Sequence, residues 1–314
     1  SGSYVRDAYL QGLTLQDQGK PNPFNFGVIG SSDTHVAGGS YTEETHFSKI
    51  GLLDGEPYLR GSVPFDGIYS LIARLWQPDS ILEIDEKNYL SFSPRLIRFG
   101  SSGLAGVWAE ENTRESIYNA FRRKETFGTS GPRIKVRFFA GYNFENSNLN
   151  DQDLIQEAYS KNVPMGGDII QEKGKNPRFL VWAISDPLGA PLQRLQIIKG
   201  WLEDGEQREK VFDVACSDGL SVDPITHRCP DNEALVNLDD CSISTDKGNS
   251  EIKTFWKDPE FKQDQDSFYY SRVLENPSCR WSTWDAIREG ETPRSDIPAT
   301  IQERAWSSPI WYIQ

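Results

Sequence analysis

The sequence predicts an α/β protein in which part of an α/β barrel is followed by an antiparallel β-sandwich-like region. The apolar run at residues 24–30 predicts a buried strand, and it leads through Gly-Ser-Ser to Asp33 and His35. Barrels of this class place their chemistry in the loops at the carboxyl ends of such strands. From about residue 178 the pattern changes to short strands separated by Gly, Pro, Asp and Asn clusters. We therefore expect residues 1–140 to form the barrel portion and residues 141–314 to form a β-rich region.

Local patterns predict where the individual elements lie. Apolar residues at helical spacing favour a helix over residues 4–14, and a second helix is expected where Asn112 and Glu115 form a capping-box pattern. The Gly-rich and Thr-rich stretch at 36–66 is typical of a long loop, expected here over the barrel mouth. Period-two alternation or β-rich composition predicts strands at 134–139, 179–184, 195–201, 210–215, 268–274 and 309–313.

The overall composition excludes two classes of partner. The chain has 314 residues, 37% of them hydrophobic and 25% charged, which is normal for a globular protein. Its net charge of -13 argues against binding to nucleic acid or to anionic membranes, because both require a basic surface. No apolar run approaches the roughly 20 residues that a membrane helix needs. We expect no nucleic-acid partner and no membrane span.

The four cysteines favour disulfides over free thiols. Cys216, Cys229, Cys241 and Cys279 have polar, turn-forming neighbours, and none is spaced Cys-x-x-Cys as in a zinc ribbon. Three connectivities are possible, of which we prefer Cys216 with Cys229 and Cys241 with Cys279. Because disulfides persist in oxidising compartments, a periplasmic or extracellular location is expected.

Asp33 and His35 form a candidate metal site. A carboxylate oxygen and a neutral imidazole nitrogen are both good ligands for a hydrolytic divalent cation such as Zn or Mn. The chain has three histidines, and only His35 follows an apolar run and a Gly-Ser-Ser turn; we interpret His46 as a surface residue. Asp-x-His alone is a weak pattern. The alternative is that Asp33 caps a turn and His35 is an ordinary surface histidine.

Several segments together resemble known families. The Gly-Ser-Ser-Asp-Thr-His run at 30–35 is similar to the last metal-binding motif of the PHP (polymerase and histidinol phosphatase) barrels. Essentially the whole chain resembles the bacterial domain-of-unknown-function family 3604. The segments that carry this second resemblance lie at residues 106–114, 122–134, 164–168, 194–201, 280–283 and 301–312.

The resemblance implies a metal-dependent hydrolase that cleaves ester, phosphoester or carbamate bonds, with a PHP-like barrel and a divalent metal. Asp33 and His35 carry over as metal ligands and catalytic residues. The chain departs from the family pattern because it has no His-x-His strand and no second histidine cluster. It therefore resembles the C-terminal half of such a protein, and we expect the N-terminal half to be a partner that completes the site.

Three further residues are candidates for binding a small ester or phosphoester substrate. Glu111 and Arg114 lie at the expected start of a helix near the proposed mouth, and Arg133 follows a turn rich in Thr, Ser and Gly. Arg114 is equally consistent with a solvated residue in a first helical turn. A non-catalytic carbohydrate- or surface-binding protein is the alternative function, because the C-terminal half is acidic and rich in Trp and Cys.

Overall fold

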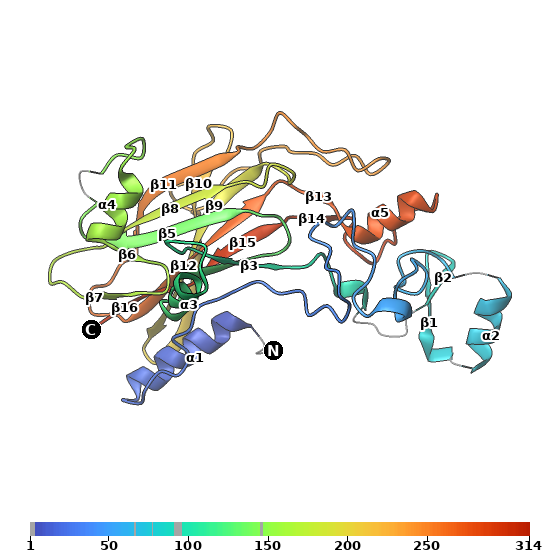
Figure 1. Ribbon diagram of the computed structural model, residues 1–314, viewed down its shortest axis with the longest axis horizontal. Coiled ribbons are helices and arrows are strands. Elements are labelled where there is room, and N and C mark those ends of the chain that lie inside the picture. Colours follow the sequence, from blue (N-terminus) through green and yellow to red (C-terminus); the bar gives the residue numbers. More distant parts are fainter. Residues whose placement is uncertain (1–3, 66, 77, 91–95, 145–146) are drawn as a thin grey trace.

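The computed structural model describes residues 4–65, 67–76, 78–90, 96–144 and 147–314 (Figure 1). Its helices, with short 3-10 turns written η, are α1 Val5–Asp17, η1 Gly51–Leu53, α2 Ile68–Trp76, η2 Pro78–Ser80, η3 Leu96–Arg98, α3 Arg114–Arg122, α4 Leu154–Lys161 and α5 Trp281–Arg288. Its strands are β1 Ile81–Ile84, β2 Lys87–Leu90, β3 Leu104–Val107, β4 Thr126–Thr129, β5 Lys135–Gly141, β6 Val163–Pro164, β7 Asp168–Ile170, β8 Arg178–Ile184, β9 Leu192–Glu203, β10 Glu206–Cys216, β11 Glu251–Lys257, β12 Ser267–Glu275, β13 Ser278–Cys279, β14 Thr300–Ile301, β15 Arg304–Ser307 and β16 Ile310–Ile313.

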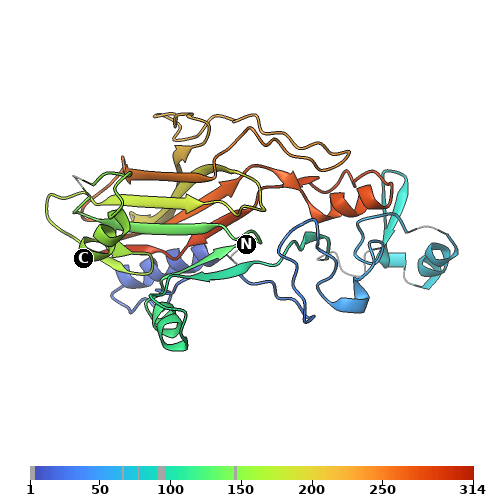
Figure 2. The same ribbon diagram turned by 45° about the horizontal axis from the view of Figure 1, so that its top comes forward.

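Two sheets pack face to face and form the body of the molecule (Figure 2). The larger sheet has the order β10-β9-β12-β15-β4-β3, and β16 pairs with both β12 and β7. The smaller sheet has the order β11-β8-β5-β6. Neighbouring strands are antiparallel except for the parallel pair β16 and β7. Both sheets are open.

The main core lies between the two sheets, where alternate residues of each strand meet. Phe138 and Phe179 from the smaller sheet stack with ring centroids 5.7 Å apart, and Phe179 also contacts Tyr269 from the larger sheet. Tyr269 and Val273 of β12 face this core, while the intervening Tyr270 and Arg272 face the other side of the larger sheet. The outer face of the larger sheet therefore carries residues that another element can cover.

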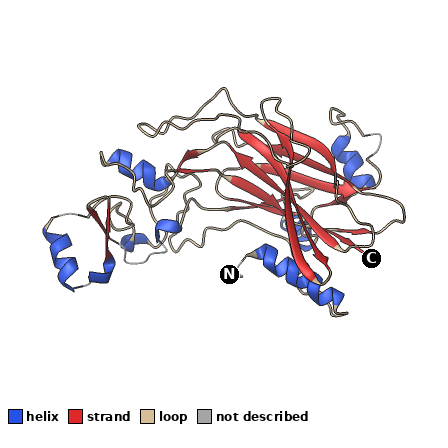
Figure 3. Ribbon diagram, turned by 180° about the vertical axis from the view of Figure 1, so that it is seen from behind, coloured by secondary structure: helices blue, strands red, loops and turns tan. Residues whose placement is uncertain are grey.

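Two helices cover the outer faces of the sheets (Figure 3). Tyr9, Leu10 and Leu13 of α1 pack on Phe268 and Trp311 of the larger sheet. On the smaller sheet, Leu154 and Ala158 of α4 pack on Phe139 and Leu180. These contacts divide the body into four layers.

A second region, which contains η1, α2, β1, β2 and α5, extends beyond one end of the sheets (Figure 1). Buried charged groups hold it together. Arg60 forms a two-pronged ion pair with Asp285 of α5, with Nε 2.7 Å from Oδ2 and Nη2 2.8 Å from Oδ1. Arg60 also donates to the carbonyl oxygens of Phe47, Asp54 and Gly55, so one buried guanidinium joins the loop before it to α5.

The predicted α/β barrel is wrong. The described residues form open, mostly antiparallel sheets and no closed barrel. The run at 24–30 is not a strand either. It contacts a strand through a backbone hydrogen bond, in which Gly30 N–H donates to Leu104 O at 3.1 Å. Its apolar residues instead pack against α1, where the rings of Phe26 and Tyr9 lie 5.2 Å apart. The expected division near residue 140 falls within β5, which pairs with β8 from the later part of the chain.

Most of the individually predicted elements are confirmed. The helix at 4–14 and the strands at 134–139, 179–184, 195–201, 210–215, 268–274 and 309–313 correspond to α1, β5, β8, β9, β10, β12 and β16. The second predicted helix is α3, but its N-cap is Thr113, which accepts from Ser116 N, rather than Asn112. No helix within the described ranges is long and apolar enough to cross a membrane.

Both preferred disulfides are confirmed. Cys216 bonds to Cys229 and Cys241 to Cys279, with Cα separations of 5.7 and 5.6 Å. The second disulfide fastens the long loop between β10 and β11 to β13. The loop around Cys241 thereby becomes a fixed wall beside the end of the larger sheet.

One buried ion pair crosses the main core. Lys199 Nζ of β9 lies 2.6 Å from Asp258 Oδ2, and the same oxygen accepts from Tyr269 Oη at 2.8 Å. The side chains of Lys199 and Asp258 are 2% and 0% exposed. Because Lys199 Nζ also donates to Glu260 O, the ammonium is surrounded by acceptors and water is excluded from it.

We predict that Asp258→Asn lowers the free energy of unfolding by about 3–5 kcal/mol, because it leaves the Lys199 ammonium buried without a counter-charge. Urea unfolding at pH 7 measures the loss. Glu203→Gln is the matched control, since Glu203 pairs with Lys262 at 2.7 Å on the exposed surface and its loss should leave the unfolding midpoint unchanged. Equal losses for the two variants would contradict a special role for the buried pair.

Candidate functional site

The extended segment at residues 28–35 starts directly on the larger sheet, where residues 28–31 lie against its strands. Val28 N–H donates to Ser308 Oγ at 2.9 Å, and Gly30 N–H donates to Leu104 O of β3. A Cβ atom on Gly30 would lie 2.4 Å from Leu104 O, and one on Gly128 of β4 would lie 2.5 Å from Gly30 N. Only glycine at both positions permits this approach of two backbones.

The same segment ends in Asp33 and His35. The His35 Nδ1 atom lies 2.8 Å from the Asp33 carbonyl oxygen, which can only accept, so Nδ1 carries the proton and Nε2 of the neutral ring keeps its lone pair. The Asp33 carboxylate is largely exposed and lies 3.0 Å from Lys49 Nζ. The hydrogen bond and the positive charge of Lys49 hold the pKa of Asp33 below its usual value, so this carboxylate is ionised at neutral pH.

One contact of this pair resembles those found in metal sites. Metal-binding histidines usually donate their second ring N–H to a carbonyl or carboxylate, as His35 does. Metal sites usually take three or more protein ligands. Across the described ranges, no three His, Cys, Asp or Glu side chains gather closely enough to hold a metal. The described residues therefore do not form a complete metal site, and the roles of Asp33 and His35 as metal ligands stay predictions.

The three predicted substrate-binding residues lie elsewhere on the surface. Glu111 and Arg114 are exposed at the start of α3, where Glu111 N–H donates to Ser116 Oγ. The Arg133 side chain is exposed and its backbone N–H donates to Asp186 Oδ2 at 2.7 Å. None of the three lines the cavity beside α1, and their roles in substrate binding stay predictions.

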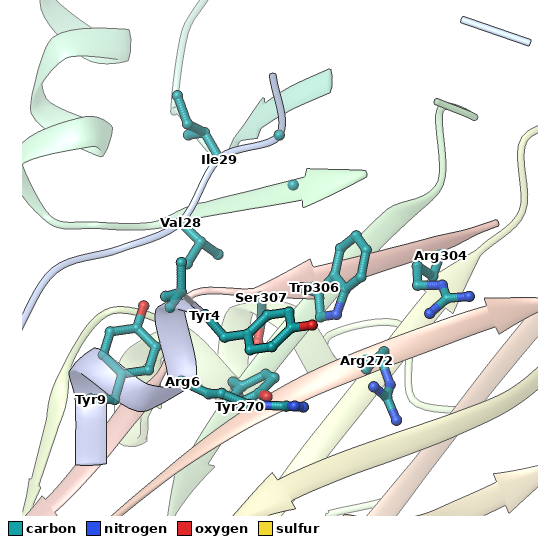
Figure 4. Close-up of a pocket in the computed structure, with 13 residues that line it drawn as sticks. Tyr4, Arg6, Tyr9, Val28, Ile29, Tyr270, Arg272, Arg304, Trp306 and Ser307 are labelled. Carbon is teal, nitrogen blue, oxygen red and sulfur yellow. The ribbon is translucent and has the colours of Figure 1, made fainter. Parts of the chain in front are cut away.

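A cavity of about 410 Å³ lies between α1, the segment at 28–30 and the outer face of the larger sheet (Figure 4). We refer to it as the arginine pocket. Its apolar wall is largely aromatic, and the charged residues among its described lining are all arginines. The lining consists of Tyr4, Val5, Arg6, Tyr9, Val28, Ile29, Gly30, Gly128, Tyr270, Arg272, Arg304, Trp306 and Ser307.

The arginines give the pocket a positive end. Arg272 of β12 and Arg304 of β15 lie together at the end farthest from Tyr9 (Figure 4). Arg272 Nε donates to Gln196 Oε1 at 2.6 Å and Arg304 Nε donates to Gln302 O at 3.0 Å, so neutral acceptors orient both guanidinium groups. Burial lowers the pKa of Arg272 from its ordinary value. Arg6 has an acidic partner, Glu209, at 3.6 Å.

One short segment of chain connects the arginine pocket to the Asp33–His35 pair. Ile29 and Gly30 line the pocket, and Asp33 follows Gly30 by three residues. Three residues span at most about 10 Å and five at most about 18 Å, which bounds the distance from Gly30 to Asp33 and to His35. Sequence reasoning missed the arginines, although the alternation in β12 shows that Arg272 shares a face with Tyr270. The covering helix α1 comes from the other end of the chain.

These features define a class of protein: two packed β-sheets that carry a cationic, aromatic ligand pocket beside an exposed Asp–His pair. The chain belongs to the family described as "Protein of unknown function (DUF3604)", which matches residues 1–314. A search of curated proteins finds no match.

We predict that Gly128→Ala detaches the segment at 28–35 from β4. The new methyl group would meet backbone atoms of Gly30, which cannot rotate away as a flexible side chain would. Hydrogen exchange should show loss of protection at the Gly30 amide. Gly38→Ala is the control, because a Cβ there meets nothing within 4 Å, and it should leave this amide protected. Full protection in the Gly128 variant would refute the close-approach argument.

Proposed function

We propose that the chain is part of a metal-dependent hydrolase that cleaves an ester, phosphoester or carbamate bond in a small anionic substrate. The observation that carries this proposal is that one short segment supplies Ile29 and Gly30 to the arginine pocket and then carries the Asp33–His35 pair. An Asp–His pair alone suits many roles, and an arginine pocket alone suits simple binding. Their combination suits a site where an anionic substrate is held beside an electrophilic centre.

Asp33 and His35 would hold Zn or Mn, and the metal would supply Lewis-acid polarisation of the scissile group. The remaining ligands are proposed to come from an N-terminal half of the same protein, as the resemblance to PHP barrels implies. Lys49 contacts one Asp33 oxygen, so this ammonium group holds the carboxylate ionised and oriented.

The chain's own residues would bind and orient the substrate. Arg272 and Arg304 offer planar guanidinium groups that match the geometry of phosphate or carboxylate oxygens. Tyr4, Tyr270 and Trp306 offer apolar surface to an aromatic or alkyl portion. Helix α1 covers the arginine pocket and excludes water from one side. The exclusion of water strengthens the interaction between the guanidinium groups and an anion.

The alternative function is a carbohydrate- or surface-binding protein. Trp281 and Trp311 are each 1% exposed and offer no stacking surface, whereas Trp306 and Trp284 line cavities and can contact a ligand. We further propose a periplasmic or extracellular location, which the two disulfides favour.

We predict that His35→Asn removes metal binding from the protein expressed from its complete natural gene. The substitution deletes the Nε2 lone pair, and zinc and manganese content after dialysis measures the effect. His227→Asn is the matched control, because His227 lies far along the chain near Cys229 and its ring packs against Phe212. We expect the control to retain full metal content. Undiminished metal in the His35 variant would contradict its role as a ligand.

We predict that Arg272→Gln and Arg304→Gln each weaken phenyl phosphate binding by about tenfold or more, since each removes a charge-assisted hydrogen-bond donor. Calorimetry in the presence of a chelator measures binding without turnover, so this result does not depend on the metal. Arg208→Gln on the exposed part of β10 is the control and should bind normally. Equal affinity for phenol and phenyl phosphate would show that the pocket does not recognise the anion.

A further inference from the structure

A second cavity, of about 220 Å³, lies where the loop at residues 41–44 meets α5 and the end of the larger sheet. We refer to it as the carboxylate pocket. It is separate from the arginine pocket and shares no lining residue with it. Its lining consists of Tyr41, Thr42, Glu43, Glu44, Pro132, Asp186, Leu188, Gly189, Ala190, Cys241, Ile243, Glu275, Ser278, Cys279, Trp284 and Glu303.

The described lining contains five acidic residues and neither lysine nor arginine. Two of the acids have structural partners. Glu43 accepts from the backbone N–H groups of Ser101 and Trp281 at 2.6 and 2.8 Å, and Asp186 accepts from those of Leu188 and Arg133. These hydrogen bonds account for the presence of Glu43 and Asp186 in the cavity wall without a bound ligand.

Glu275 is different, because its carboxyl group is buried and only one of its two oxygens has a hydrogen-bond partner. The residue is 1% exposed, and Oε2 accepts from Ala190 N at 3.3 Å. Its Oε1 atom is buried without a hydrogen-bond partner. An unpaired buried carboxyl oxygen is costly, and here it belongs to a side chain that lines a cavity.

Glu303 lies beside Glu275 and interacts with it electrostatically. Its carboxylate accepts from Ser101 Oγ and Ser130 Oγ. Burial, together with neighbouring acids, raises the pKa of Glu275 to about 9 and that of Glu303 to about 7.

Charged groups outside the lining only partly offset the acids. The positive charge of Arg304 lowers the pKa of Glu303, and Arg280 interacts electrostatically with Glu43. Arg288 lies 3.9 Å from Glu44 at the rim. A positive charge inside the cavity would stabilise the ionised carboxylates and lower the pKa of Glu275 and Glu303 again.

The size and walls of the cavity indicate which kind of cation fits. Its volume is below the roughly 300–1,000 Å³ typical of sites for drug-sized ligands, so the occupant is small. The acids of the described lining are not grouped as a metal would require. Tyr41 and Trp284 offer aromatic surface, and Leu188 and Ile243 offer aliphatic surface, which suits a cation with a carbon chain.

We propose that the carboxylate pocket binds a small organic cation, an alkylammonium group, with Glu275 and Glu303 as its charge partners. The Cys241–Cys279 disulfide forms one wall and holds it against β13. This site is independent of the proposed hydrolase function, and it binds its ligand without metal.

The test is calorimetric titration of the protein with n-butylammonium, in a chelator, against 1-butanol as the neutral probe of similar shape. We expect butylammonium to bind and butanol not to bind. Affinity should rise between pH 6 and pH 9, because the two glutamates ionise in this interval while the ammonium, with a pKa of about 10.4, stays charged. Equal binding of the two probes, or no binding of butylammonium at pH 9, would overturn the proposal.

Variants assign the charge partner. Glu275→Gln keeps the shape of the side chain and should weaken butylammonium binding by about tenfold or more at pH 9. Glu44→Gln is the control, because Glu44 is exposed at the rim and water screens its charge, so affinity should fall less than about twofold. A larger loss for Glu44 than for Glu275 would contradict the assignment.

The ammonium group has two natural sources, a free amine or a lysine side chain. Comparison of butylammonium with Nα-acetyl-lysine methylamide separates them. Tighter binding of butylammonium indicates a free amine, and tighter binding of the capped lysine indicates a peptide; either result supports the site. If neither cation binds to the oxidised protein, the proposal is wrong.

Discussion

The close approach of the segment at 28–35 to the larger sheet is the constraint on which the candidate site depends. Gly30 and Gly128 meet backbone to backbone, and any side chain at either position would push the segment away. Because the segment lies flat, Ile29 and Gly30 close one wall of the arginine pocket. The same path carries the chain to Asp33 and His35. A local steric condition therefore fixes the position from which the segment continues to the pair.

The two ends of the molecule are stabilised by different forces. Aromatic and aliphatic packing between sheets and helices stabilises the body, as in the contact between Phe179 and Tyr269. The region around α5 depends instead on buried charges, of which the Arg60–Asp285 pair is central. Buried ion pairs cost desolvation energy and tolerate little change of geometry. The carboxylate pocket lies where these two regions meet, and three of its acids, Glu43, Glu275 and Glu303, are buried.

The sequence predicted local structure better than architecture. Alternation located β5, because its core-facing residues, such as Val136 and Phe138, repeat every second position. The polar surroundings of the cysteines predicted both disulfides. The apolar run at 24–30 led to the wrong barrel prediction. Its apolar residues Phe26 and Val28 pack in the cluster around α1 and do not belong to a strand. The arginine pocket was not predictable, since Arg6 and Arg272 are 266 positions apart and meet only after folding.

The claim that the pocket and the Asp33–His35 pair form one site can be tested most directly with Mn²⁺ as a paramagnetic probe. The measurement is the width of the ³¹P resonance of phenyl phosphate in exchange with the arginine pocket, with and without bound Mn²⁺. The account predicts strong broadening in the native protein and its loss in the His35→Asn variant, which should still bind the phosphate. An unchanged line width while both Mn²⁺ and phenyl phosphate are bound would place the two far apart and contradict a single site.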